Sequence, residues 1–275
     1  YGMELLQHLI QHRFPSLRDW VSNVCGAVLG AALAWLAHSL GMLDLWRRVR
    51  ERWFLPNSSA AVFLILIWPV GLLFPTPVPL GLGQVGPELR EFLLWAVADT
   101  PYESAWAGVI GHAARAQEPL SRGRESLVIA LGLLAPCLVA AVVTRRGWRR
   151  WMLAPVALGL AMAIMTLSTA LNFGPDHAAT WMTPATVHTL LLACALGMGL
   201  ALAGPRVSAA IGLVALTAMV VIVNEAPADP YYAASLQGWE QGRFIRFHGL
   251  AQWIGLLWPY AAMGWLISRL AGGPR

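Results

Sequence analysis

The sequence predicts an all-α fold, a polytopic transmembrane helical bundle, and three observations support this fold class. Of the 275 residues, 57% are hydrophobic and 12% are charged, whereas a soluble domain has about twice that charged fraction. The mean hydropathy is +0.59. Apolar stretches of about 20 residues, the length that crosses a bilayer core, recur along the chain. We therefore expect about seven spanning helices plus two outer amphipathic helices.

Each predicted span is an apolar stretch bounded by polar residues, proline or glycine. The seven spans are expected near residues 20–43, 58–80, 126–143, 152–172, 183–203, 209–226 and 250–270. The run Pro75-x-Pro77-x-Pro79 is expected to end the second span in an extended stretch. Residues 1–45 thus hold an N-terminal motif with the first span, and residues 46–275 hold six further spans.

The longest polar region, residues 84–125, is expected to form two outer amphipathic helices. In the first, Pro87 suits position N1 and Glu88 suits the first turn. The apolar stripe of this helix is Leu89, Phe92, Leu93 and Ala96. The second helix is expected to begin at Pro101, with Arg115 near its end. Such helices either lie in the outer headgroup layer or cover a cavity.

The arginines predict the orientation of the spans. Linkers 44–57 and 144–151 hold four arginines each, and positively charged loops favour the cytoplasmic side. With both linkers in the cytoplasm, the N-terminus of this chain lies outside and its C-terminus lies in the cytoplasm. Because the arginines form short runs between apolar segments, they indicate orientation, and we expect no nucleic-acid partner.

One face of the first predicted span carries polar and small residues in helical register. Asp19, Asn23, Gly26 and Gly30 lie at i, i+4, i+7 and i+11, which is one face of an α-helix. Gly26 and Gly30 form a small-xxx-small pair, which allows close approach of a second helix. From the spacing alone, an ordinary membrane helix with a polar cap and a packing seam explains this face.

The stretch from Glu4 to Gly30 resembles the VanZ-like family of membrane proteins. The match is Glu4-x-x-Gln7, Arg13, Ser16 and Asp19-x-x-x-Asn23-x-x-Gly26-x-x-x-Gly30. In that family this run leads into the last core helix, and here the resemblance covers about 45 of the 275 residues. The earlier helices of the family are expected upstream of Tyr1, so we expect the chain to be a fragment or to lack its front half.

The resemblance implies a role in the bacterial cell envelope. The VanZ-like family is associated with lowered susceptibility to glycopeptide antibiotics, notably teicoplanin. It implies an integral protein of the inner membrane that binds membrane lipids and a lipid-linked glycan or cell-wall precursor in an outward-facing polar pocket. The candidate ligand-binding residues are Glu4, Gln7, Arg13, Asp19 and Asn23 from this motif, together with Arg243, Arg246 and His248, which do not belong to the motif and lie at the predicted outer entry to the last span. Gly26 and Gly30 are assigned to helix packing.

Polar residues beside the later spans also gather at the predicted outer ends. They are Asn172, Asp176, His177, His188, Asn224, Glu225, Arg243, Arg246, His248 and Gln252. Polar groups at membrane depth are costly unless they face a cavity or one another, so this distribution indicates a pocket. Solvated helix caps explain it equally well. The arginines could pair with phosphate or carboxylate groups, or simply contact headgroups.

No catalytic or cofactor motif occurs in the sequence. The three cysteines and seven histidines lack metal-ligand spacing, and neither a G-x-S-x-G elbow nor a phosphate-binding loop is present. We expect no cofactor and no metal. Two alternatives to a binding protein stay open. One is a membrane enzyme with Glu4, Asp19 or His248 as an acid–base group. The other is a transporter, although no span carries a charge firmly at its middle.

Overall fold

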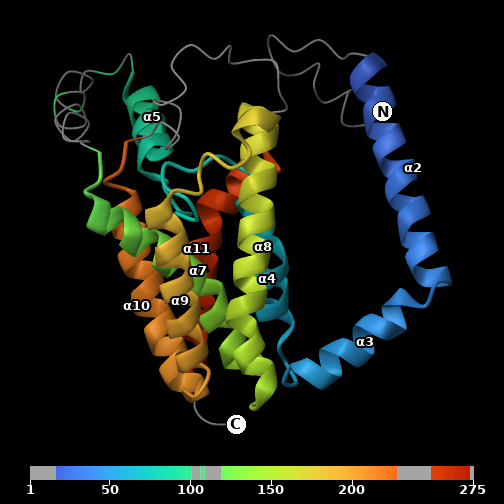
Figure 1. Cartoon of the computed structure of the whole chain (residues 1–275). Helices are drawn as coiled ribbons and strands as arrows, with labels where there is room; N and C mark the ends of the chain where they lie inside the picture. The colour runs from blue at the N-terminus through green and yellow to red at the C-terminus, as the bar shows by residue number, and fades with distance from the viewer. Residues whose placement is uncertain are drawn as a thin grey trace. The chain divides into compact units, whose positions relative to one another are not determined.

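The computed structural model of the chain describes residues 17–98, 100, 106, 108, 119–227 and 249–272. The chain divides into two compact units, Tyr1–Trp53 and Phe54–Arg275. In the first unit the helices are α2 (Leu17–Ser39) and α3 (Met42–Trp53). The described helices of the second unit are α4 (Ser59–Gly71), α5 (Gly86–Val97), α7 (Arg122–Val143), α8 (Trp148–Phe173), α9 (Pro184–Leu200), α10 (Pro205–Val223) and α11 (Leu250–Ala271), and a 3-10 turn spans Pro175–His177 (Figure 1).

Several of these helices are apolar enough to cross a membrane. Helices α7, α8, α10 and α11 also have the necessary length, and a fifth span results if α2 and α3, which are bent by 72°, count as one. Helices α4 and α9 are apolar but have only 13 and 17 residues. The predicted all-helical fold with several apolar helices is confirmed, whereas the count of seven spans is not.

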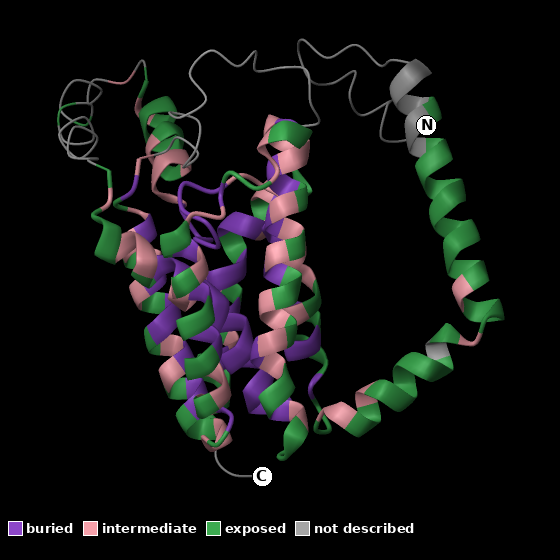
Figure 2. Ribbon diagram, in the orientation of Figure 1, coloured by how far each residue is buried: buried purple, intermediate pink, exposed green. Residues whose placement is uncertain are grey.

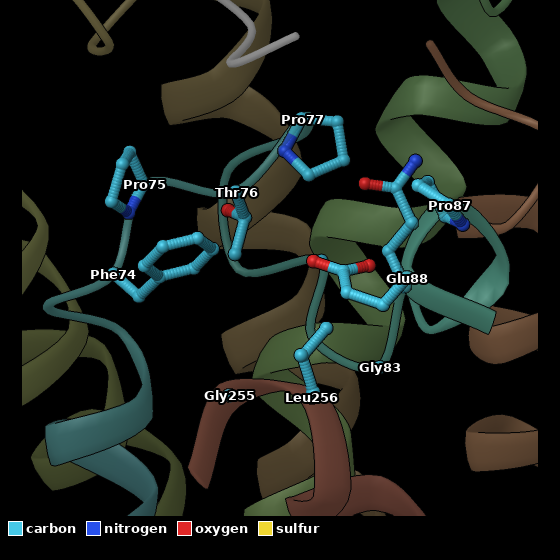
Figure 3. A pocket seen from close by; sticks show the side chains of 11 residues that line it. Phe74, Pro75, Thr76, Pro77, Gly83, Pro87, Glu88, Gly255 and Leu256 are labelled. Atoms are coloured by element: carbon cyan, nitrogen blue, oxygen red, sulfur yellow. The ribbon is translucent and has the colours of Figure 1, made fainter. Parts of the chain in front are cut away.

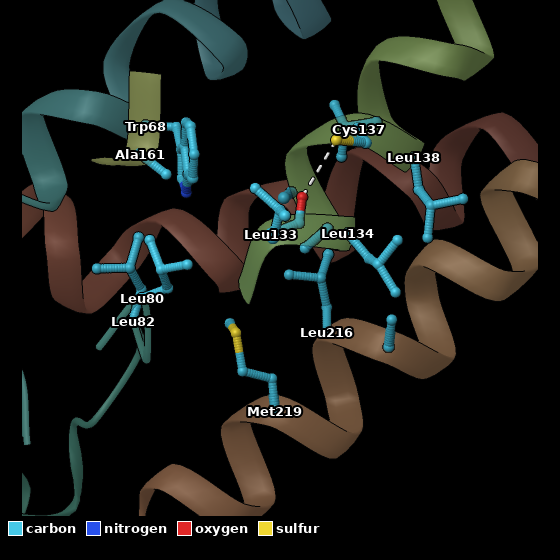
Figure 4. Packing of buried hydrophobic residues seen from close by; sticks show 14 of the residues in the cluster. Trp68, Leu80, Leu82, Leu133, Leu134, Cys137, Leu138, Ala161, Leu216 and Met219 are labelled. Atoms are coloured by element: carbon cyan, nitrogen blue, oxygen red, sulfur yellow. Dashed lines mark hydrogen bonds between the residues drawn. The ribbon is translucent and has the colours of Figure 1, made fainter. Parts of the chain in front are cut away.

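Helix α7 lies at the centre of the second unit. Every residue from 132 to 143 is buried (Figure 2), and helices α4, α8, α9 and α10 pack around it. A helix that is apolar on all sides is stable where protein or lipid shields it from water, and here protein covers most of α7. The packing around α7 includes residues that are not helical, since Leu80 and Leu82 lie in the same cluster as Leu133 and Leu216 (Figure 4).

Residues 72–85 form an irregular segment that is buried inside the bundle, and we call it the 72–85 segment. Helix α4 ends at Gly71, so only the first part of the predicted span 58–80 is helical. Residues 76–84 are all buried, although Pro75, Pro77 and Pro79 exclude a helix here. Leu80 adopts a positive φ of 64°, an uncommon conformation for a branched side chain.

The first predicted amphipathic helix is present as α5. Pro87 lies in its first two positions and Glu88 in its first turn, as the sequence predicts. The apolar stripe of this helix is exposed: Leu89 is 54% and Phe92 59% accessible. The second amphipathic helix lies outside the described residues, except for Trp106 and Gly108.

Arg150 joins two helix ends at the arginine-rich end of the second unit. Its side chain is 2% exposed. Nε donates a hydrogen bond to the carbonyl of Thr144 at 3.0 Å, and Nη1 donates to the carbonyl of Ala203 at 2.7 Å. These carbonyls follow α7 and α9, where the helix dipole favours a cation.

Replacing Arg150 with leucine is expected to destabilise the bundle. The change leaves two carbonyls without their donor, and the relief of a desolvated charge offsets part of that loss, so we expect about 2 kcal/mol. Thermal unfolding of the purified protein in detergent measures the change. Arg206→Leu, at an exposed position in α10, is the control and should unfold as the wild type does. Equal melting of Arg150→Leu and the wild type would contradict the bridging role.

Candidate functional site

A cavity of about 190 Å³ lies beside the 72–85 segment. We call it the α4 cavity because the segment that forms its main wall continues directly from α4. The walls come from this segment, from the first turn of α5 and from the second turn of α11 (Figure 3). The lining residues are Phe74, Pro75, Thr76, Pro77, Gly81, Gly83, Gln84, Pro87, Glu88, Gly255 and Leu256.

The backbone of the 72–85 segment is satisfied by side chains and backbone groups of neighbouring helices. From α8, Ser168 Oγ and Asn172 Nδ2 both donate to the carbonyl of Leu73, at 2.8 and 3.1 Å. On the α11 side, the amide of Gly83 donates to the carbonyl of Gly255 at 3.0 Å. Irregular backbone at membrane depth is tolerated only where it is buried in protein or lines a cavity. These bonds meet that requirement.

Asn224, at the end of α10, binds both the 72–85 segment and the first residue of α5. Its Oδ1 accepts a hydrogen bond from the amide of Gly86 at 2.7 Å, and its Nδ2 donates to the carbonyl of Gly83 at 3.0 Å. The hydroxyl of Tyr260 in α11 donates to the same carbonyl at 3.0 Å. Gly83 is therefore held by α10 and α11 together, and this position sets one wall of the cavity.

Two glycines let the segment and α4 approach other helices closely. A Cβ atom added at Gly132 of α7 would lie 2.5 Å from the carbonyl oxygen of Leu80, and one added at Gly71 would lie 3.1 Å from the Cα of Gly255. Gly132 is ten residues into α7, about 15 Å from its start at 1.5 Å per residue. The segment therefore reaches the middle of the central helix.

Three polar side chains line the α4 cavity, and one of them is charged. Thr76 and Gln84 are buried, and Glu88 is half-buried. Figure 3 shows the Glu88 carboxylate among Thr76, Pro77 and Leu256. Gln252 Nε2 lies 3.5 Å from Glu88 Oε1, which is the long limit for a hydrogen bond. Among the described residues that line this cavity, none is an arginine, a lysine or a histidine.

Most of the candidate ligand-binding residues lie outside the part of the chain that the structure describes. Six lie outside the described residues: Glu4, Gln7, Arg13, Arg243, Arg246 and His248. Asp19 and Asn23 lie in α2, and for these two residues the structure describes the backbone. Gly26 and Gly30 are exposed in α2, and a Cβ added at either has no atom within 4 Å. The ligand-binding and packing roles of these residues stay predictions, as does a pocket between the first and the last span.

The other polar residues at the predicted outer ends have separate roles. Asn172 and Asn224 bind the 72–85 segment. Glu225 forms an ion pair with Arg124 at the start of α7, and the ring of His188 bonds within its own helix. Two of the polar residues that we predicted at these ends bond to residues that line the α4 cavity: Gln252 bonds to Glu88, and Asn224 bonds to Gly83.

Sequence reasoning did not select Thr76, Gln84 or Glu88 as site residues. The prolines before residue 80 and the glycines after it were a usable signal, because this composition excludes a regular helix inside an apolar stretch. The expectation of no metal is untested. In the part of the chain that the structure describes, no three His, Cys, Asp or Glu residues lie close enough together to hold a metal ion.

Comparison of the chain with models of known protein families, with curated proteins and with solved structures gave no match. The VanZ-like resemblance therefore rests on the N-terminal motif and stays a prediction.

Proposed function

We propose that the chain is a multi-pass protein of the bacterial inner membrane that binds the headgroup of a lipid-linked or cell-wall glycan component in the α4 cavity. One observation carries this proposal. An apolar helix stops at Gly71, and the irregular segment that follows it walls a cavity with polar side chains. In membrane proteins, interrupted helices of this kind form ligand sites.

The size of the cavity limits what enters it. A cavity of about 150 Å³ holds benzene, so 190 Å³ accepts one small headgroup or one sugar ring. The rest of a lipid-linked glycan would stay outside. We propose binding rather than catalysis, because Glu88 is the single acid–base group among the described residues that line the cavity.

The proposed orientation places the cavity on the outer side of the membrane. Asn172, at the end of α8, binds the 72–85 segment, whereas Arg145, Arg146 and Arg150 lie just before α8 or in its first turn. Arginine-rich linkers favour the cytoplasm. An outer site has access to headgroups of the outer leaflet and to cell-wall precursors. With seven spans, the N-terminus of this chain lies outside and the C-terminus inside.

The VanZ-like resemblance connects this binding to glycopeptide susceptibility. If the N-terminal motif contributes to the function, cells that produce the chain should tolerate more teicoplanin than cells without it, and Asp19→Ala and Asn23→Ala should abolish that difference. The minimal inhibitory concentration measures the effect, and immunoblots of isolated membranes report protein levels. Loss of tolerance with intact levels supports ligand binding by this motif. Equal loss of protein would instead assign both residues to packing.

Transport is the second candidate function. Helix α4 is about 20 Å long, two thirds of a bilayer core, and the segment after it reaches the middle of α7. Half-length helices beside a cavity are typical of transporters. Flux in proteoliposomes separates the two functions, since a binding protein retains the headgroup on one side of the membrane.

A further inference from the structure

We propose that the α4 cavity takes a headgroup that carries a protonated amine, and that the carboxylate of Glu88 binds its positive charge. This inference rests on the proposed headgroup-binding function and specifies the chemical class of the ligand. It follows from the charge, the hydrogen-bonding capacity and the size of the cavity.

Glu88 brings a negative charge into the cavity, and no cation among the described residues lies in the cavity wall to match it. Its contact with Gln252, at 3.5 Å, is to a neutral amide, and no ion pair of Glu88 occurs in the part of the chain that the structure describes. By contrast, Glu225, just after α10, forms an ion pair with Arg124 in the first turn of α7. A half-buried carboxylate is costly unless a charge or several donors satisfy it. A protonated amine would supply a positive charge and hydrogen-bond donors together.

The remaining polar groups of the cavity offer acceptors rather than donors. The hydroxyl of Thr76 donates to the carbonyl of Val78 at 2.7 Å. The amide nitrogen of Gln84 donates to the carbonyls of Ala226 and Pro227 at 2.9 and 3.2 Å. The hydroxyl oxygen of Thr76 and the amide oxygen of Gln84 are therefore the neutral side-chain groups left for a ligand. An ammonium group has three donors and no acceptor, and it matches these acceptors and Glu88.

The same groups disfavour an anionic ligand. Phosphate and carboxylate need donors, and proteins bind them through arginine, lysine or backbone amides. The lining residues that the structure describes include neither arginine nor lysine, and the amide of Gly83 already donates to the carbonyl of Gly255. The carbon atoms of a small headgroup would pack on Phe74 and the proline rings, which form the apolar walls.

Binding measurements on the full chain test the ligand class with two amine sources. The lipid source is phosphatidylethanolamine, added to nanodiscs of phosphatidylglycerol and detected on the protein by native mass spectrometry. The soluble source is glucosamine, measured by calorimetry against N-acetylglucosamine, in which acetylation removes the charge. We expect retention of the ethanolamine lipid over the glycerol lipid, or at least tenfold tighter binding of glucosamine than of N-acetylglucosamine. Either result supports the amine class and identifies its source.

A matched pair of variants tests the role of Glu88. Glu88→Gln keeps the shape and removes the charge, so amine binding should fall by about tenfold to a hundredfold, as for loss of a hydrogen bond to a charged group. Glu125→Gln is the control, because Glu125 is also half-buried in the first turn of its helix but does not line the cavity. Its amine binding should equal that of the wild type.

The outcomes separate the two proposals. Equal binding of amine, uncharged and anionic headgroups, unchanged in Glu88→Gln, would overturn the amine class and leave headgroup binding in place. No binding of any of these headgroups to the wild type would overturn headgroup binding as well. The comparison of glucosamine with N-acetylglucosamine uses only the wild type, so it stands even if Glu88→Gln does not fold.

Discussion

Gly132→Ala is expected to displace the 72–85 segment and to destabilise the second unit by about 3 kcal/mol, the upper end for overpacking a core. The added methyl carbon would lie 2.5 Å from the carbonyl oxygen of Leu80 and 2.8 Å from its Cβ. Neither atom is the end of a flexible side chain, so the backbone of the segment must move. Leu80 is fully buried, and the core offers no space for that movement.

Thermal unfolding in detergent measures the loss of stability, and hydrogen exchange of the Gly81 amide reports the movement. That amide donates to the carbonyl of Val78 at 2.9 Å, so its protection should fall in Gly132→Ala. Gly159→Ala in α8 is the control, since a Cβ there meets no atom within 4 Å. An alanine in a helix interior should leave its stability unchanged or raise it slightly. Wild-type stability of Gly132→Ala would mean that the segment does not lie against α7.

Long apolar stretches without proline clusters predicted the positions of helices correctly. Helices α7, α8, α10 and α11 occur where we predicted spans, because a long stretch without proline clusters has one stable form in a bilayer. Their starts differ by a few residues: α7 begins at Arg122 rather than near residue 126, and α10 begins at Pro205 rather than near residue 209. Polar and proline residues of the first turn belong to these helices but lower the hydropathy that defines a span.

The second predicted span shows where this reasoning ends. Residues 58–80 are almost wholly apolar, and hydropathy reports burial without distinguishing a helix from irregular chain. Helix α4 ends four residues before Pro75, because the segment gains bonds from α8, α10 and α11 that lie far away in sequence. Such bonds cannot be read from local composition.

The candidate site was missed for the same reason. Its walls combine residues 74–88 with Gly255 and Leu256, which the sequence assigns to the second predicted span, the polar region after it and the seventh predicted span. Glu88 was interpreted as a first-turn acid of an amphipathic helix, and it does occupy that place in α5. Its second role, as the charge in a cavity, depends on α11 and on the 72–85 segment. The N-terminal motif, in contrast, was recognisable as a pattern, and its function stays a prediction.

Loss of Asn224 together with Tyr260 is expected to cost more than the two single losses added. Asn224→Ala removes the donor to Gly83 and the acceptor for the Gly86 amide, so we expect about 2 kcal/mol. Tyr260→Phe removes one further donor to the Gly83 carbonyl, for about 1 kcal/mol. In either single variant this carbonyl keeps one partner. In the double variant it has lost both donors, which adds about 1 kcal/mol of coupling.

Unfolding of the four proteins of this double-mutant cycle, each in the same detergent, measures the coupling. Thr217→Ala is the control in α10, since its exposed hydroxyl contacts Leu213 and the sulfur of Met263 and has no contact with the Gly83 carbonyl. Paired with Tyr260→Phe, it should give additive losses. The bonds to the Gly83 carbonyl matter for the proposed ligand binding as well as for stability. Its position fixes the wall of the α4 cavity, so the double variant should lose amine binding while Thr217→Ala keeps it. Additive losses for Asn224 and Tyr260 would show that the two side chains do not share this carbonyl, and the irregular segment would then have no common anchor between α10 and α11.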